Sequence, residues 1–208
     1  PGESRGILPK VADWSGTSAP TMAFGQGYSL TAMQATSIFA TIANDGVRVS
    51  PTVIAGTRDA SGNFTPAPGR TSQRVVSSET AKVMRLMMES VVSGNGTAPS
   101  AAIPGYRVAG KTGTAQRIDD TCGCYRGYTA SFIGFAPADN PAYVISVTIQ
   151  DPKGMHWGGV LGGPVFKKVM SFVLQSRHIA PTGTAFEPIP LDKKALAAKK
   201  AQDATANN

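Results

Sequence analysis

The residues best suited to chemistry lie in one short segment, residues 105–114. Its last four residues are Lys111, Thr112, Gly113 and Thr114. Residues 105–112 fit the pattern of glycine, four residues, glycine, lysine and threonine that cradles nucleotide phosphates. A phosphate loop must follow a buried strand and open a helix, whose N-terminal amides face the phosphates. Neither flank complies, because small residues and prolines precede the segment and no helical apolar stripe follows it.

The same segment has a different chemical meaning if it forms a strand. Thr112 and Thr114 then occupy alternate positions and direct their hydroxyls to one face. Gly113 has no side chain, so an extended peptide can approach the strand closely. Lys111 adds a positive charge that suits an acidic substrate terminus, or the charge that develops during acyl transfer. The pattern indicates recognition of an extended acidic ligand, although a Lys-Thr-Gly turn without function also fits so short a motif.

Three strands are predicted close together in the chain, over residues 106–115, 128–136 and 143–150. In the last of them apolar residues recur at every second position, which is typical of a strand whose one face is more apolar than the other. The short connections favour an antiparallel meander over parallel crossovers. A sheet of three strands with two open edges is incomplete, so this sheet is expected to be part of a larger one.

Helices are predicted on both sides of these strands in the sequence. Residues 31–44 begin with a capping box of Thr31 and Gln34. Ser78 is predicted to cap a second helix, which stops before Gly94. A final helix is predicted over residues 164–177, with a proline in its first turn. The expected fold class is therefore α/β, an antiparallel sheet flanked by helices.

The composition indicates one globular domain followed by a tail. Residues 1–180 are predicted to form the domain, and residues 181–208, which lack an apolar face, are predicted to be disordered. The net charge is +7. The positive charges are mostly scattered singly among acids, which is typical of a solvated basic surface, so no nucleic-acid partner is predicted.

The two cysteines, Cys122 and Cys124, are too close together for a Cys-x-x-Cys redox or zinc pair, and no second pair exists. No metal site and no cofactor are predicted. A small disulfide and two free thiols both fit this spacing, so their redox state stays open. No apolar stretch in the sequence is long enough to span a membrane.

Four separated segments, in the right order, resemble the penicillin-binding proteins, and among them the class B, division-type peptidoglycan D,D-transpeptidases. They are residues 1–6, 24–34, 105–115 and 158–166. The third contains the Lys-Thr-Gly element known for this family. The resemblance covers about residues 1–177. It implies a β-lactamase/transpeptidase-like fold, of which this chain would be the C-terminal half of the transpeptidase domain.

The resemblance also implies a mechanism, serine acyl transfer on peptidoglycan stem peptides that end in D-Ala-D-Ala. β-Lactams would acylate the same serine. Thr112 and Thr114 would bind the ligand carboxylate, and the Thr114 amide would form half of the oxyanion hole. Lys111 would hold the carboxylate and the proton-relay network electrostatically, and Gly113 would admit the ligand.

This sequence departs from the family pattern in one large respect, since no serine is followed by lysine three residues later. The nucleophile, and the family's second motif, Ser-x-Asn, are therefore expected before Pro1, in an upstream half of the same protein. The chain alone is expected to be inactive. The resemblance further implies an N-terminal membrane anchor, an extracytoplasmic location and a glycosyltransferase partner in the division machinery.

Two kinds of alternative remain open. A D,D-carboxypeptidase or a β-lactamase would share the Lys-Thr-Gly strand but use water as the acceptor. From a different class, a non-catalytic sensor or scaffold module could bind penicillin or peptidoglycan without any nucleophile. The upstream sequence separates these classes, because an active enzyme must supply Ser-x-x-Lys.

Overall fold

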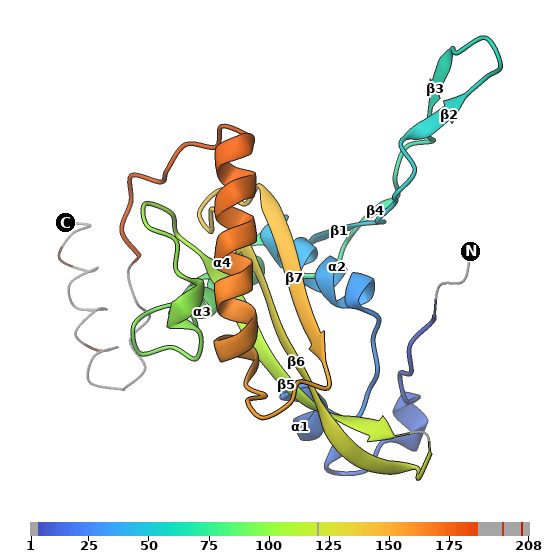
Figure 1. Ribbon diagram of the computed structural model, residues 1–208, viewed down its shortest axis with the longest axis vertical. Coiled ribbons are helices and arrows are strands. Elements are labelled where there is room, and N and C mark those ends of the chain that lie inside the picture. Colours follow the sequence, from blue (N-terminus) through green and yellow to red (C-terminus); the bar gives the residue numbers. More distant parts are fainter. Residues whose placement is uncertain (1–3, 120, 187–196, 198–204, 206–208) are drawn as a thin grey trace.

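The computed structural model describes residues 4–119, 121–186, 197 and 205. Its centre is a three-stranded antiparallel sheet in the order β5, β6, β7 (Figure 1). The strands are β5 (Ala109–Asp119), β6 (Cys124–Ala136) and β7 (Tyr143–Gln150). This confirms the predicted antiparallel meander and the α/β fold class. The third strand has the same bounds as the prediction.

Helices cover both faces of the sheet (Figure 1). They are α4 (Gly158–Ser176) on one face, and α2 (Ala32–Ala43) and α3 (Ser78–Ser90) on the other. Strand β6 supplies the centre of both cores, because its side chains alternate between the faces. Phe132 packs with Phe166 of α4, whereas Phe135 packs with Met88 of α3. The sheet is thus clamped between two apolar layers.

Helix α4 begins at Gly158, six residues before the predicted start at Pro164, which lies inside the helix. The glycines before Pro164 allow the first two turns of the helix to pack closely against the sheet. A Cβ atom at Gly162 would lie 2.8 Å from Cβ of Phe132 on the sheet. The predicted start was wrong because contact with the sheet outweighs the low helix propensity of glycine.

The first two strands also differ from their predicted bounds. Residues 106–108 are not part of β5, because the Arg107 amide donates to Thr182 Oγ1 and the Arg107 carbonyl accepts from Ala138. At its other end β5 continues to Asp119 and pairs with the start of β6. The two strands therefore form a hairpin that projects beyond the sheet (Figure 1). Cys122 and Cys124 are joined by a disulfide at its tip.

Helix α2 begins as predicted, and α3 begins one residue earlier than its predicted cap implied. The Thr31 hydroxyl accepts from the Gln34 amide, and the Gln34 side chain accepts from the Thr31 amide, so the capping box is confirmed. In α3 the capping residue is Ser77, whose hydroxyl accepts from the Thr80 amide. The prediction of Ser78 was wrong because Ser77 still has extended backbone, whereas Ser78 is already helical.

We expect Ser77→Ala to lower the free energy of unfolding by about 1 kcal/mol, since it removes the acceptor for an otherwise unpaired amide of the first turn. Ser78→Ala is the matched control and should have a smaller effect. Equilibrium urea unfolding of the 208-residue chain measures both. A larger loss for Ser78→Ala than for Ser77→Ala would show that the cap has been assigned to the wrong serine.

Residues 47–74 form a long arm that projects from the sheet and its helices (Figure 1). It consists of two short antiparallel strand pairs, β1 with β4 and β2 with β3. Their bounds are Val47–Val49, Gly56–Arg58, Phe64–Pro66 and Ser72–Arg74 in order from β1 to β4. Each of the four strands is three residues long, so the arm has little regular structure of its own.

Short helices occur in the segment before α2 and in the segment between α3 and β5. They are η1 (Val11–Asp13), α1 (Ser18–Ala23) and η2 (Pro99–Ala101). Each is six residues or fewer. Such short pieces complete at most two turns, so they leave no apolar periodicity from which to predict them.

Near its end the described chain contacts the segments that precede β5 and follow β6, beyond the predicted boundary at residue 180. The Thr182 amide donates to the Gly105 carbonyl, and the Thr184 hydroxyl contacts Asp139. Of the predicted tail, residues 187–196, 198–204 and 206–208 lie outside the described residues.

Within the part that the structure describes, no helix has the length and apolarity needed to cross a membrane.

Candidate active site

The segment Lys111 to Thr114 lies in the middle of β5, which ends the sheet order on one side. Its cross-strand partners on β6 run from Ile133, opposite Lys111, to Ala130, opposite Thr114. In the described part of the chain no strand pairs with the other edge of β5. This confirms that the segment forms a strand, and it places that strand at the edge of the sheet. It also excludes the phosphate loop, which would have required a helix to begin here.

Thr112 and Thr114 lie on the same face of the sheet, as their alternate positions predicted. Their partners Phe132 and Ala130 are buried beside α4, so both threonines face the start of that helix. The Thr114 hydroxyl accepts a hydrogen bond of 3.2 Å from the Gly158 amide, the first residue of α4. Because this amide uses one lone pair, the hydroxyl hydrogen of Thr114 is free to point elsewhere.

The Lys111 ammonium contacts the next residue along the strand, Thr112. Its Nζ donates to the Thr112 carbonyl at 2.9 Å and to the Thr112 hydroxyl at 3.4 Å. A third group joins them, because the hydroxyls of Thr97 and Thr112 are 3.2 Å apart. Thr97 was not found from the sequence. It lies in a loop of small residues, 15 positions from its partner, and no periodicity or motif links the two.

Gly113 is half-buried and lies opposite Ser131 on β6. A Cβ atom at Gly113 would lie 2.4 Å from Ser131 Oγ. The absence of a side chain was predicted to admit a ligand, and the structure adds a second reason for glycine, namely room for a neighbouring hydroxyl. Since that hydroxyl can rotate, the strand itself would tolerate alanine with a small adjustment.

An aromatic cluster borders the Thr114 end of the segment. The rings of Tyr128 and His156 stack with their centroids 4.2 Å apart, and His156 and Trp157 follow at 4.9 Å. Trp157 is the residue immediately before α4, so the cluster is adjacent to the Gly158 amide that holds Thr114.

The acids near the hairpin are paired and ionised. A hydrogen bond from Lys153 is the main cause that lowers the pKa of Asp151, and hydrogen bonds from Thr121 lower the pKa of Asp119. Asp119 also forms an ion pair with Arg126 at 3.2 Å. Their negative charges are thus already matched by neighbours at the projecting end of the hairpin.

The tripeptide Ser-x-Asn, which the resemblance placed upstream, also occurs within the chain at residues 61–63 and 93–95. The first lies in the turn of the β2 and β3 hairpin on the arm. In the second, the Ser93 hydroxyl donates to the Ser90 carbonyl at the end of α3. Neither tripeptide is on β5, and neither is assigned to the site.

No group of three or more potential metal ligands occurs within residues 4–119, 121–186, 197 and 205. Two cavities of the chain, of about 300 and about 610 Å³, lie elsewhere. The smaller is lined by Glu89 and Arg107, and the larger by α2 and the base of the arm. Neither cavity is lined by residues 111–114, which lie on the edge strand of the sheet.

Comparison with known proteins identifies the family. The family model described as penicillin binding protein transpeptidase domain matches residues 1–171. Penicillin-binding protein PbpB of Mycolicibacterium smegmatis is 44% identical over 191 residues, which are 87% of this chain and 29% of PbpB. Peptidoglycan D,D-transpeptidase FtsI of Escherichia coli is 35% identical over 188 residues, 86% of this chain and 29% of FtsI.

Among solved structures, penicillin binding protein 3 of Mycobacterium tuberculosis, complexed with ampicillin, superimposes with a TM-score of 0.83. The match has 39% sequence identity and covers 92% of this chain and 45% of that one. The chain thus spans about 29% of the length of PbpB and FtsI, and 45% of the solved chain. Because the family model covers most of the chain and the fold agrees, the chain belongs to the penicillin-binding protein transpeptidase domain family.

Proposed function

We propose that the chain is part of a peptidoglycan D,D-transpeptidase and supplies the ligand-binding edge of its active site. The observation that supports this most directly is the grouping of one ammonium and two hydroxyls at the open edge of β5. Lys111, Thr112 and Thr114 together suit a carboxylate, which charged and hydroxyl donors bind strongly. The stem peptide that ends in D-Ala-D-Ala and the β-lactams both offer such a carboxylate.

In this proposal the nucleophile comes from the upstream half of the same protein. A serine hydroxyl there, deprotonated by a lysine one helical turn later, attacks the carbonyl of the penultimate D-alanine. The Thr114 amide donates to the oxyanion, and terminal D-alanine leaves with the proton. The amino group of a neighbouring stem peptide then attacks the acyl enzyme and releases the serine, which completes the cross-link.

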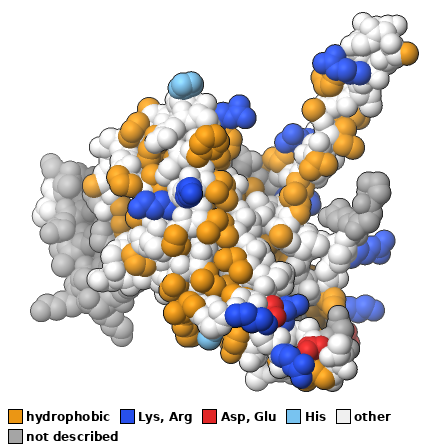
Figure 2. All heavy atoms as spheres, viewed as in Figure 1, with side chains coloured by type: hydrophobic (Ala, Val, Ile, Leu, Met, Phe, Trp, Pro, Cys, Tyr) orange, Lys and Arg blue, Asp and Glu red, His pale blue; other side chains and the backbone are white. Residues whose placement is uncertain are grey.

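Exposed apolar residues support the need for an upstream half. Hydrophobic side chains are exposed along the outer side of α4 (Figure 2), where Val165, Val169 and Phe172 lie on one stripe of the helix. A stripe of this kind marks a contact surface. The part of the relatives that this chain does not match is large enough to cover it.

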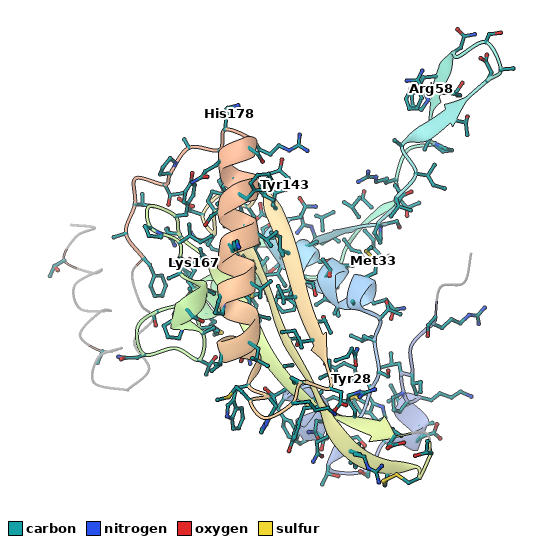
Figure 3. The ribbon with its side chains drawn as sticks, viewed as in Figure 1. Tyr28, Met33, Arg58, Tyr143, Lys167 and His178 are labelled. Carbon is teal, nitrogen blue, oxygen red and sulfur yellow. A yellow bond between two sulfur atoms is a disulfide. The ribbon has the colours of Figure 1, made fainter. Side chains whose placement is uncertain are left out.

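The proposed location is the extracytoplasmic face of the cell membrane, with an anchor in an N-terminal segment outside this chain. The disulfide between Cys122 and Cys124 supports an oxidising compartment. Division machinery that includes a glycosyltransferase is the proposed partner, because cross-linking needs newly made glycan strands. Basic side chains are dispersed over the molecule, with Arg58 on the arm and Lys167 on α4 (Figure 3), so no nucleic-acid partner is proposed.

Labelling with a fluorescent penicillin tests this function. We define the completed domain as residues 1–186 of this chain joined to the preceding part of the transpeptidase domain of M. smegmatis PbpB. The chain alone should not be labelled, because it contains no Ser-x-x-Lys, whereas the completed domain should be. A folded completed domain that binds penicillin only reversibly would instead support the non-catalytic sensor or scaffold.

A further inference from the structure

We infer that Thr97 is a positioning residue, which orients the hydroxyl of Thr112 toward the ligand carboxylate. The inference rests on the proposed function and adds to it a residue outside the Lys-Thr-Gly-Thr segment. It starts from the group in which Thr97 Oγ1, Thr112 Oγ1 and Lys111 Nζ are adjacent.

The hydrogen-bonding capacities of these atoms determine what Thr97 can do. An ammonium only donates, so the Thr112 oxygen accepts from Lys111. A hydroxyl has one hydrogen and two acceptor sites. If Thr97 donates to the second acceptor site of Thr112, the single hydrogen of Thr112 remains for the ligand. If Thr112 donates to Thr97 instead, that hydrogen is occupied.

A bound carboxylate selects the first of these arrangements. The hydrogen bond from a hydroxyl to a charged oxygen is stronger than that between two neutral hydroxyls. Thr97 can change from acceptor to donor by rotation of its own hydroxyl, at 3.2 Å, without movement of the chain. Valine at this position would leave Thr112 with one neighbour fewer and a hydroxyl that is free to turn away.

The loop that contains Thr97 is fixed by packing against the core, so the position of the Thr97 hydroxyl is also fixed. The next residue, Ala98, is 1% exposed, and its amide donates to the Val91 carbonyl at 2.9 Å. The loop also lies directly against α4, because a Cβ atom at Gly159 would be 2.1 Å from the Thr97 carbonyl oxygen. The Ser100 hydroxyl donates to the Gly159 carbonyl at 3.0 Å and closes this contact.

The first turn of α4 thus positions the hydroxyls of both Thr112 and Thr114. Gly158 contacts Thr114 directly through its amide. Gly159 acts on Thr112 indirectly. Because it has no side chain, the loop that contains Thr97 can approach β5 and place the Thr97 hydroxyl beside Thr112. The neighbouring residues Gly158 and Gly159 therefore position Thr114 and Thr112, the two hydroxyl residues of the proposed carboxylate site.

The test is the rate of acylation by low concentrations of fluorescent penicillin, measured on the completed domain at equal folded protein. Thr97→Val should slow acylation about 3- to 10-fold, the rate equivalent of one neutral hydrogen bond. Thr97→Ser, which keeps the hydroxyl, should stay within about 2-fold of the parent. Thr36→Val is the control, since the Thr36 hydroxyl bonds only within α2, to the Ala32 carbonyl.

A second comparison, in a domain that already carries Thr112→Val, distinguishes a positioning role of Thr97 from a general loss of structure. In a Thr112→Val parent, a further Thr97→Val should change the rate less than about 2-fold, because Thr97 acts through the hydroxyl that is already missing. Equal slowing in both backgrounds, or no slowing in either, would overturn the inference. If the parental completed domain is folded but not labelled at all, the proposed function falls as well.

Discussion

Thr114→Val should slow acylation of the completed domain by fluorescent penicillin about 10- to 100-fold. Valine keeps the volume and the strand preference of threonine but removes the hydroxyl. That hydroxyl accepts from the Gly158 amide, so its hydrogen is directed away from the helix and is available to the ligand carboxylate. A charge-assisted contact of this kind contributes roughly 1.5 to 3 kcal/mol, which corresponds to the expected rate change.

Stopped-flow or gel-based labelling, with each variant normalised for folded protein, measures this effect. Thr57→Val is the matched control, because Thr57 is also a strand residue but is exposed on β2 of the arm, away from β5. The control should be labelled at the parental rate. If Thr114→Val is also labelled at that rate, Thr114 does not bind the carboxylate, and the role assigned to this strand is wrong.

Glu89→Ala should lower the free energy of unfolding by about 3 kcal/mol. The Glu89 carboxylate is almost fully buried, with its side chain 2% exposed, and accepts from Arg107 Nε at 2.8 Å and Nη2 at 2.7 Å. Removal of one partner of such a pair leaves the other charge in a poorly hydrated place, which is strongly destabilising. Arg107 lies two residues before the start of β5, so the pair also joins α3 to the segment that leads into the site strand.

Urea unfolding of the 208-residue chain measures this effect, with Glu79→Ala in the exposed first turn of α3 as the control. The double variant Glu89→Ala with Arg107→Ala should be destabilised by less than the sum of the single changes, since the two side chains interact directly. Additive losses, or a loss below about 1 kcal/mol for Glu89→Ala, would show that the ion pair contributes little to stability.

The local features of this fold could be predicted because each depends on neighbours in the chain. The capping box of Thr31 and Gln34 joins residues three apart, and the alternation of β7 repeats every two residues. The Lys-Thr-Gly-Thr strand is likewise a local pattern. Together with three other segments in the right order, it was enough to indicate the family that the comparisons show.

The start of α4 shows where such reasoning fails. Its glycines and Pro164 have low helix propensity. Only tertiary packing makes a helix favourable there, as where Gly162 packs against Phe132, on a strand about 30 residues earlier in the chain. The partner of Glu89 was equally hidden, since a glutamate in a helix gives no sign of the arginine 18 positions away that it will bind.

The proposed carboxylate site could thus be predicted from the amino-acid types of Lys111, Thr112, Gly113 and Thr114, since hydroxyl, ammonium and the lack of a side chain are properties of single residues. What orients these residues depends on the packing of distant segments. The Gly158 amide and the Thr97 hydroxyl come from segments 44 and 15 positions away from their partners. Contacts of that separation depend on how the helix, the loop and the sheet pack together, and no spacing in the chain encodes them.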